Sequence, residues 1–442
     1  MIEAAMTLVD VARDPGAGYG EVFTRRWVVD LILDLVGYTP EKDLGAQTLI
    51  EPSCGIGAFL VPIVQRLVES SEAHGRDLRS LSSAVRAFDL LEANAERARK
   101  ALVELLTDRG VGRGEAEALV GEWVTTGDFL LHPHDPLSAD YVVGNPPYIR
   151  LENVSRRTMD AYRRVCPTMR GRADIYVGFI ERGLDVLKPG GALSFICADR
   201  WMRNQYGADL RALITSAYSV EAVIAMHDVD AFEDDVSAYP AVVVLRNGRQ
   251  GKAAVVDANG SFKEPQARRL SSWVRGGRKP SIGDGSFEAT RVDGWFEGRD
   301  LWPAGSPANL ALLADLEARF PSLEDESTGT VVGIGLASGC DEVYLTRDPD
   351  AVEPDRLLPM LESCDIASGA VTWSGTRLIN PWDDDGLVDL AEYPRLRAYF
   401  GANEGRLRGR FVARRRPDAW YRTIDRVNPG RSPSGRNCCC RT

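Results

Sequence analysis

The stretch QTLIEPSCGIGAFLVPIVQRLVES (residues 47–70) contains the pattern on which the fold prediction rests. A short apolar run is followed by a turn with Gly55 and Gly57, and then by a long segment with apolar residues at helical spacing. Strand, glycine turn and amphipathic helix make up one unit of an alternating β/α fold. Upstream, residues 18–38 predict another helix, with Thr24 as its N-cap.

The same plan recurs further along the chain. SAVRAFDLLEANAERARKAL (83–102) predicts a strand that ends at Asp89 and a helix after it. WVTTGDFLL (123–131) and ADYVVGNPPY (139–148) predict two more strand ends, and residues 175–201 predict a helix, a turn and a further strand. Strands that alternate with helices indicate an α/β protein with a doubly wound, mostly parallel sheet.

The length of 442 residues predicts more than one domain. Residues 1–248 are expected to form the α/β domain, because the alternating pattern continues through two strands in 220–248. Residues 249–300, which include RGGRKPSIGDGSF, predict a linker or irregular connection. Residues 301–442 predict a second, mixed α/β domain.

Charge is distributed unevenly along the chain, which has a net charge of -11. Residues 405–442 contain eleven arginines and two acidic residues, and residues 150–172 contain seven arginines and two acidic residues. Each stretch alone is typical of a solvated surface. Two such stretches in an acidic protein also fit an anionic polymer as a partner.

Cysteine and histidine positions argue against a metal site. Five cysteines are scattered, the other three are consecutive near the C-terminus, and none forms a CxxC pair or lies near a histidine. No apolar tract is long enough to span a membrane, and the N-terminus lacks the pattern of a secretory signal. The expected compartment is therefore the reducing cytoplasm.

Three predicted strand ends carry residues suited to a nucleotide-like ligand. Gly55 and Gly57 allow close approach of the backbone at a helix N-terminus. Asp89 stands where an acid can accept hydrogen bonds from ribose hydroxyls, although it can equally cap a helix. Asp128 can bind an adenine amino group, and Phe129 can pack on the ring. Because ligands of such sheets bind at the carboxyl ends of strands, the three together predict one site.

A fourth strand leads into GNPPYIR (144–150). Two prolines fix the backbone and end the strand, and an aromatic residue follows at once. NPP sequences also occur as plain turns.

Taken together, GEVFT (20–24), EPSCGIGAFL (51–60), FDL (88–90), GDF (127–129) and GNPPYIR (144–150) resemble the class I S-adenosylmethionine-dependent methyltransferases. More narrowly, the chain resembles the adenine-N6 DNA methyltransferases of restriction–modification systems, in the gamma arrangement. Glu51 stands where many members have aspartate, and Arg25 stands where proline often follows the threonine.

The resemblance implies a Rossmann-like catalytic domain, S-adenosyl-L-methionine as cofactor, and two sets of site residues. The cofactor set is Thr24, Glu51, Pro52, Cys54, Gly55, Gly57, Asp89, Asp128, Phe129 and Asn145. The catalytic set is Asn145, Pro146, Pro147 and Tyr148, with Tyr148 and Phe232 stacking on an adenine flipped out of double-stranded DNA. In this arrangement the Asn145 side-chain oxygen and the Pro146 carbonyl grip both hydrogens of the target amine.

Three alternatives remain open at this point. NPPY also occurs in methyltransferases that act on RNA or on protein glutamine, where the planar-nitrogen chemistry is the same. A non-catalytic DNA-binding subunit is a third possibility, which the intact Asn145, Pro146 and Tyr148 disfavour.

The C-terminal region resembles a target-recognition domain at VVGIGLASGCDEVYLT (331–346) and LRGRFVARRRPDAWYRTIDR (407–426). The end, GRSPSGRNCCCRT (430–442), departs from the family pattern. If its Asn-Cys-Cys-Cys-Arg stretch is encoded as AAC TGC TGC TGC CGN, a one-base shift would encode three leucines and a proline. We therefore expect a frameshift near Pro429 and a partial, truncated recognition domain. No nuclease motif is evident, so a separate restriction endonuclease is the expected partner.

Overall fold

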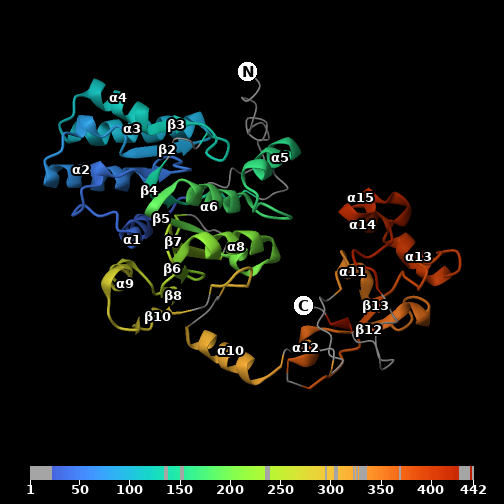
Figure 1. Cartoon of the computed structure of the whole chain (residues 1–442). Coiled ribbons are helices and arrows are strands. Elements are labelled where there is room, and N and C mark those ends of the chain that lie inside the picture. Colours follow the sequence, from blue (N-terminus) through green and yellow to red (C-terminus); the bar gives the residue numbers. More distant parts are fainter. Residues whose placement is uncertain are drawn as a thin grey trace. The chain divides into compact units, whose positions relative to one another are not determined.

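The computed structural model describes residues 22–133, 138–149, 154–233, 239–293, 296–302, 307–321, 324, 327, 336–367, 370–427 and 439–440 (Figure 1). The chain forms two compact units, Met1–Arg319 and Phe320–Thr442. Each unit has its own sheet and its own hydrophobic core.

One large sheet organises the first unit, and its ten described strands have the order β3-β2-β1-β4-β5-β7-β6-β8-β10-β9. The parallel half consists of β1 (Leu49–Glu51), β2 (Val85–Asp89), β3 (Val124–Thr126), β4 (Ala139–Gly144) and β5 (Leu187–Ala198). β7 (Pro240–Arg246) runs antiparallel between β5 and β6 (Ser219–Ala225), and β8 (Ala253–Ala258) runs parallel to β6. The antiparallel strands β10 (Phe287–Val292) and β9 (Ser281–Gly283) complete that edge.

Helices cover both faces of this sheet (Figure 1). One face packs against α1 (Arg26–Val36), α2 (Leu60–His74), α3 (Glu92–Asp108), α4 (Arg113–Trp123) and α9 (Glu264–Gly276). The other packs against α5 (Arg156–Val165), α6 (Ile175–Asp185), α7 (Arg200–Arg203) and α8 (Ala208–Ala217). Side chains alternate accordingly: Tyr141 and Val143 of β4 enter the first core, and Val142 enters the second. Burial on both faces explains the nearly continuous apolar strands, and the predicted doubly wound, mostly parallel fold is confirmed.

The segment predicted as a linker, residues 249–300, is different in the structure. It contains β8, α9, β9 and β10, which extend the large sheet, and Ala254, Val256 and Trp273 are buried in the core. The glycine- and proline-containing stretch that suggested a linker lies around the connection between α9 and the short strand β9. The first unit also includes α10 (Pro307–Arg319), so the second unit starts later than the predicted residue 301.

The second unit is a small mixed α/β body. Its sheet has the order β11-β13-β12-β14, formed by β11 (Leu345–Thr346), β12 (Leu357–Leu361), β13 (Arg377–Ile379) and the two-residue β14 (Cys439–Cys440). Around it lie α11 (Asp341–Tyr344), α12 (Ser363–Ile366), α13 (Pro394–Ala402), α14 (Glu404–Arg408) and α15 (Phe411–Arg415). Tyr344, Leu378 and Phe400 are fully buried in its core. The predicted frameshifted tail lies outside the described residues, apart from the backbone of β14.

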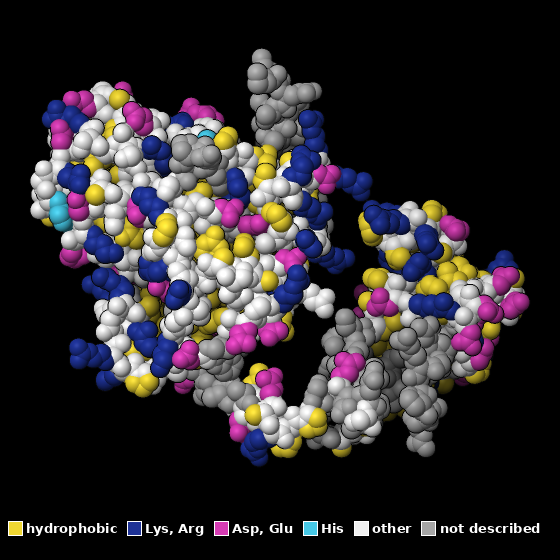
Figure 2. Space-filling view, in the orientation of Figure 1, with side chains coloured by type: hydrophobic (Ala, Val, Ile, Leu, Met, Phe, Trp, Pro, Cys, Tyr) yellow, Lys and Arg dark blue, Asp and Glu magenta, His cyan; other side chains and the backbone are white. Residues whose placement is uncertain are grey.

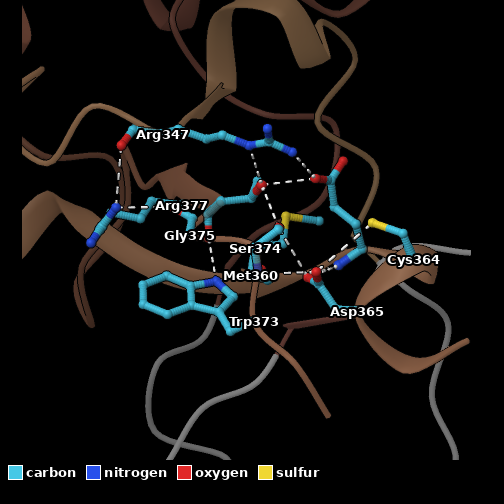
Figure 3. Close-up of polar contacts among 10 residues, drawn as sticks. Arg347, Met360, Cys364, Asp365, Trp373, Ser374, Gly375 and Arg377 are labelled. Atoms are coloured by element: carbon cyan, nitrogen blue, oxygen red, sulfur yellow. Dashed lines mark hydrogen bonds and ion pairs between the residues drawn. The ribbon is translucent and has the colours of Figure 1, made fainter. Parts of the chain in front are cut away.

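A polar cluster fastens the long connection between β12 and β13 (Figure 3). The buried Asp365 carboxylate accepts hydrogen bonds from the backbone N–H groups of Glu362 and Ser374 and from the Ser374 hydroxyl. The Trp373 indole N–H donates to the carbonyls of Met360 and Thr376. Hydrogen bonds to the charged carboxylate lower the Asp365 pKa, the Glu362 backbone N–H contributing most.

The packing of α6 against the sheet gives a test of the fold. A Cβ at Gly183 in α6 would lie 2.6 Å from Leu193 Cδ1, so Gly183→Ala overpacks the core and is expected to lower the free energy of unfolding by about 1–3 kcal/mol. The matched control is Gly121→Ala in α4, where a Cβ meets no atom within 4 Å. That variant is expected to gain about 0.5–1 kcal/mol from helix propensity alone. Denaturant unfolding measures both, and equal effects would contradict the packing.

Candidate active site

A pocket opens where the carboxyl ends of β1, β2 and β4 meet the loop after β3. It brings together most of the residues predicted from sequence: Thr24, Glu51, Pro52, Cys54, Gly55, Asp89, Asp128, Phe129, Asn145 and Pro147. Gly57, Pro146, Tyr148 and Phe232 do not line it. Carboxyl ends of parallel strands share one edge of the sheet, which is why residues far apart in sequence converge here.

The glycine loop after β1 has the conformation its sequence predicts. Gly55 and Gly57 have φ angles of +52° and +103°, values that side chains with a Cβ rarely adopt. The Gly55 N–H donates to the Asp89 carboxylate at 2.8 Å, and the Cys54 N–H donates to the Phe88 carbonyl. The loop is thereby tied to the end of β2.

Asp89 accepts backbone hydrogen bonds on both of its carboxylate oxygens, and its role in ribose binding stays a prediction. One carboxylate oxygen accepts from Gly55, and the other accepts from the N–H of Leu91 at the start of α3, at 2.9 Å. The carboxylate therefore braces the glycine loop against the next helix while it lines the pocket. The Asn94 side-chain amide donates to the same oxygen that accepts from Leu91, at 3.5 Å.

The third strand end is completed by a residue that sequence reasoning missed. The Asp128 carboxylate accepts from the Leu130 N–H at 2.9 Å and from the Tyr162 hydroxyl of α5 at 2.8 Å. Burial raises the Asp128 pKa, and the bond from Tyr162 opposes part of that rise. Phe129 is buried beside it and stacks on Phe179 of α6. Tyr162 lies in a stretch noticed only for its arginines, but its place on the apolar face of α5 was a usable signal.

Glu51 is a buried carboxyl group at the end of β1. Desolvation raises its pKa well above the ordinary value, and the nearby Asp89 charge adds to the effect. Its Oε2 atom has no hydrogen-bond partner among the described residues. A buried acid without a partner favours its neutral form until a cationic group binds beside it.

The Asn145 amide has a fixed orientation. Its Nδ2 donates to the Val22 carbonyl at 2.9 Å and to Thr24 Oγ1 at 3.3 Å. A carbonyl can only accept, so the nitrogen must face Val22 and Oδ1 must face the other way. Oδ1 is buried and has no partner in the part of the chain that the structure describes. The Ser53 hydroxyl donates to the Asn145 carbonyl at 3.1 Å and holds the corner from the β1 side.

Thr24 is not the N-cap of α1, as the sequence predicted. The N-cap is Arg25, and no side chain caps the helix there. The Thr24 hydroxyl instead accepts the hydrogen bond from Asn145, and its backbone forms a β-bridge with Phe232. Arg25 forms ion pairs with Asp230 and Glu233, so this departure from the family pattern ties the N-terminal segment to the loop after β6.

Tyr148 and Phe232 are in contact beside the corner. Their ring centroids are 6.3 Å apart and their planes make an angle of 85°, an edge-to-face pair. A base sandwiched between them requires the rings to turn and separate, so the stacking role stays a prediction. Burial raises the Tyr148 pKa, and its hydroxyl has no hydrogen-bond partner among the described residues.

The arginines near the C-terminus mostly bind their own unit. Arg410 donates to the carbonyls of Ser338, Trp420 and Arg422 and to the Tyr344 hydroxyl. The Arg408 guanidinium lies over the Trp420 ring. Much of the pattern that suggested DNA contacts in 407–426 therefore serves the packing of the second unit.

No cluster of three or more histidine, cysteine, aspartate or glutamate side chains that could hold a metal ion occurs among the described residues. In the same part of the chain, no helix combines the length and the hydropathy that a membrane span needs.

Comparison with known proteins defines the class to which this pocket belongs. Residues 120–232 match the family model of the Eco57I restriction-modification methylase. The chain is 41% identical over 416 residues to the Type II methyltransferase M.PaeR7I of Pseudomonas aeruginosa, covering 93% of this chain and 71% of that protein. It is 40% identical over 423 residues to the Type II methyltransferase M.XhoI of Xanthomonas vasicola, covering 93% and 76%.

Solved structures agree with the fold. A nuclease-deletion mutant of the Type ISP restriction-modification enzyme LlaGI, in complex with a DNA substrate mimic, matches with a TM-score of 0.51 and 15% identity, over 75% of this chain and 35% of that chain. The type IIG restriction endonuclease BpuSI matches with a TM-score of 0.50 and 13% identity, over 84% and 44%. The protein is thus a methyltransferase of the restriction–modification class. It belongs to the family of Type II DNA methyltransferases, the modification components of these systems.

Glu51 gives a pH-dependent test of the pocket. Burial makes the pKa of Glu51 higher in the folded protein than in the unfolded protein. The group therefore adds its full contribution to the stability of the fold at pH values below its unfolded pKa. This contribution is lost as the pH rises through its folded pKa. Glu51→Gln cannot ionise, so its melting temperature is expected to rise relative to wild type as the pH is raised above the ordinary carboxyl pKa of about 4.3. Glu104→Gln, which replaces an exposed carboxyl of α3, is the control. A constant difference between Glu51→Gln and wild type across this range would contradict the buried, shifted carboxyl.

Proposed function

We propose that this enzyme transfers a methyl group from S-adenosylmethionine to the N6 amino group of adenine in DNA. The observation that carries the proposal is the buried Oδ1 of Asn145, which has no hydrogen-bond partner among the described residues and is held in place by the bonds from Nδ2 to Val22 and Thr24. A buried acceptor without a partner costs free energy, and a substrate N–H group would supply the missing partner.

The pocket fits the cofactor by two features of its own. Glu51 has a buried oxygen beside the glycine loop that no described residue contacts through a hydrogen bond, which suits the cationic methionine end. Asp89 lies at the next strand end, which suits the ribose. Asp128 and Phe129 would hold the adenine edge and face. Thr24, Pro52, Cys54, Gly55 and Asn145 complete the walls, and Gly57 shapes the loop from outside them. When bound, the cofactor supplies an electrophilic methyl group on a sulfonium.

The residues of the corner act on the amine that receives the methyl group. An aromatic amine is a weak nucleophile because its lone pair is delocalised into the ring. Asn145 Oδ1 and the Pro146 carbonyl can each accept one of its hydrogens, which favours a pyramidal nitrogen with its lone pair directed at the methyl group. Pro146 and Pro147 lack N–H groups and fix the backbone. The Pro146 carbonyl is therefore held in the same position with and without the substrate. The cationic product amine is acidic enough to lose its proton to water.

The target base has to leave the duplex to reach this corner. Tyr148, which follows the two prolines, is placed to stack on it, and such stacking contributes roughly 1–3 kcal/mol per base. Phe232 is already in contact with Tyr148 and would form the second surface once the rings separate. The second unit, residues 320–442, would read the sequence around the base, and a separate restriction endonuclease would be the partner in the system.

Identifying the methylated product tests the proposal. Purified protein is incubated with labelled cofactor and, in parallel, with duplex DNA, RNA and a glutamine-containing protein, and each polymer is digested and analysed. Label in N6-methyladenine from DNA is expected. Label confined to RNA or to a protein amide would replace the proposal by one of those activities, and no transfer to any polymer would favour a non-catalytic subunit.

Asn145→Ala removes the proposed acceptor. The turnover number is expected to fall by at least about 10²–10³-fold, the effect of removing one preorganised hydrogen-bonding group in an active site, with little change in cofactor affinity. Asn145→Asp keeps the shape but loses the donors to Val22 and Thr24, so it is expected to fail as well. Single-turnover rates and cofactor titration measure the two quantities separately. Unchanged turnover in Asn145→Ala would refute the role assigned to this side chain.

A further inference from the structure

Helix α5, whose Tyr162 lines the pocket, has a strongly cationic outer face. The described segment 154–172 contains six arginines, all exposed, and a single acidic residue, Asp160. Figure 2 shows basic side chains gathered over this helix. Arg156, Arg157 and Arg164 form no hydrogen bond or ion pair with the described residues, whereas Arg170 pairs with Asp209.

The helix is well formed, which gives these charges fixed positions. The Ser155 hydroxyl caps it by accepting from the Thr158 N–H at 3.1 Å. Thr158, Met159 and Tyr162 are buried on its inner face. Arg156 and Arg157 are separated from Arg163 and Arg164 by two turns, about 10 Å along the axis. Leaving several like charges unpaired on one helix costs stability, which an anionic partner would offset.

The inner face ties the helix to the pocket. Tyr162 both lines the pocket and donates to Asp128, the residue proposed to hold the cofactor adenine. The arginines therefore have a defined position relative to Asn145, because both belong to the same compact unit.

We propose that the arginine face of α5 is a phosphate-binding surface that holds the DNA backbone beside the pocket. It rests on the proposed function only in taking DNA as the polymer that enters the site. Guanidinium groups bind phosphate oxygens strongly. Arg163 donates to the carbonyls of Met169 and Gly171, but Arg156 and Arg157 lie about two turns from Arg164, a spacing that suits phosphates a few nucleotides apart on one strand. Tyr162 is then a positioning residue that sets the helix against the pocket.

The experiment measures binding of duplex DNA to the full chain over a series of salt concentrations, with three triple variants. R156Q/R157Q/R164Q removes the three unpaired charges of α5. R249Q/R275Q/R278Q is the matched control, because these arginines are also exposed and unpaired among the described residues. Arg275 and Arg278 lie at the end of α9, which packs on the opposite face of the sheet, and Arg249 lies in the loop between β7 and β8. R156K/R157K/R164K keeps the charge and removes the guanidinium fork.

Each lost phosphate contact is expected to reduce the slope of log affinity against log salt by about 0.9, so the α5 glutamine variant should lose between about 2 and 3 units of slope. Its DNA affinity should fall roughly 10-fold or more near physiological salt. The KM for cofactor and the turnover at saturating DNA should stay close to wild type. The lysine variant should retain most of the slope, because phosphate binding depends mainly on charge.

An unchanged slope in the α5 glutamine variant, or an equal loss in the α9 control, would overturn the proposal. The proposal would also be overturned if the lysine variant bound DNA as weakly as the glutamine variant. That result would indicate that the guanidinium forks bind base edges instead of phosphates. Circular dichroism establishes that each variant is folded before binding is measured. The readout is binding without methyl transfer, so a product other than N6-methyladenine would refute the proposed function and leave this surface standing.

Discussion

The amide of Asn145 cannot rotate, and the rest of the pocket depends on that constraint. Its nitrogen is committed to the Val22 carbonyl and the Thr24 hydroxyl, which leaves its oxygen buried and without a partner among the described residues. The cost of an orphaned buried acceptor is tolerated only where surrounding contacts impose it. Here the surrounding contacts come from Ser53 on the β1 side of Asn145 and from the N-terminal segment on its other side.

The strand ends around this corner share one design. Each places a carboxyl or amide group at the same edge of the sheet, and each group also holds a neighbouring loop or helix. Asp89 fastens the glycine loop to α3, and Asp128 fastens the loop after β3 to α5. Glu51 differs from these two, because its Oε2 atom holds no neighbouring loop or helix among the described residues. Burial keeps its pKa high, which favours the neutral carboxyl group until a cation binds beside it. The groups proposed to bind ligands are thus preorganised by bonds within the protein, which would reduce the reorganisation needed when ligands bind.

Sequence reasoning reached the sheet and most of the pocket for a physical reason. Local signals include the glycine turn after β1, Asp89 at the end of β2 and Asp128 after β3. They fix positions that a parallel sheet must bring together. It failed where partners are distant in sequence. Nothing local shows that Thr24 bonds to Asn145 rather than capping α1, or that Tyr162 reaches Asp128. The strands within 249–300 were missed because their turn residues resemble a linker, although β8 and β10 pair along their whole lengths.

The bridge between Thr24 and Phe232 has a consequence for how the protein is made. Residues 23–25 exchange backbone hydrogen bonds with residues 231–233, so one wall of the pocket joins the two ends of a stretch of more than two hundred residues. During synthesis the N-terminal segment leaves the ribosome early and has to wait for the loop after β6 before it can dock. Until then Asn145 lacks the contacts that orient it. A growing chain therefore contains every signature motif well before it contains a finished site, which delays chemistry until most of the first unit exists.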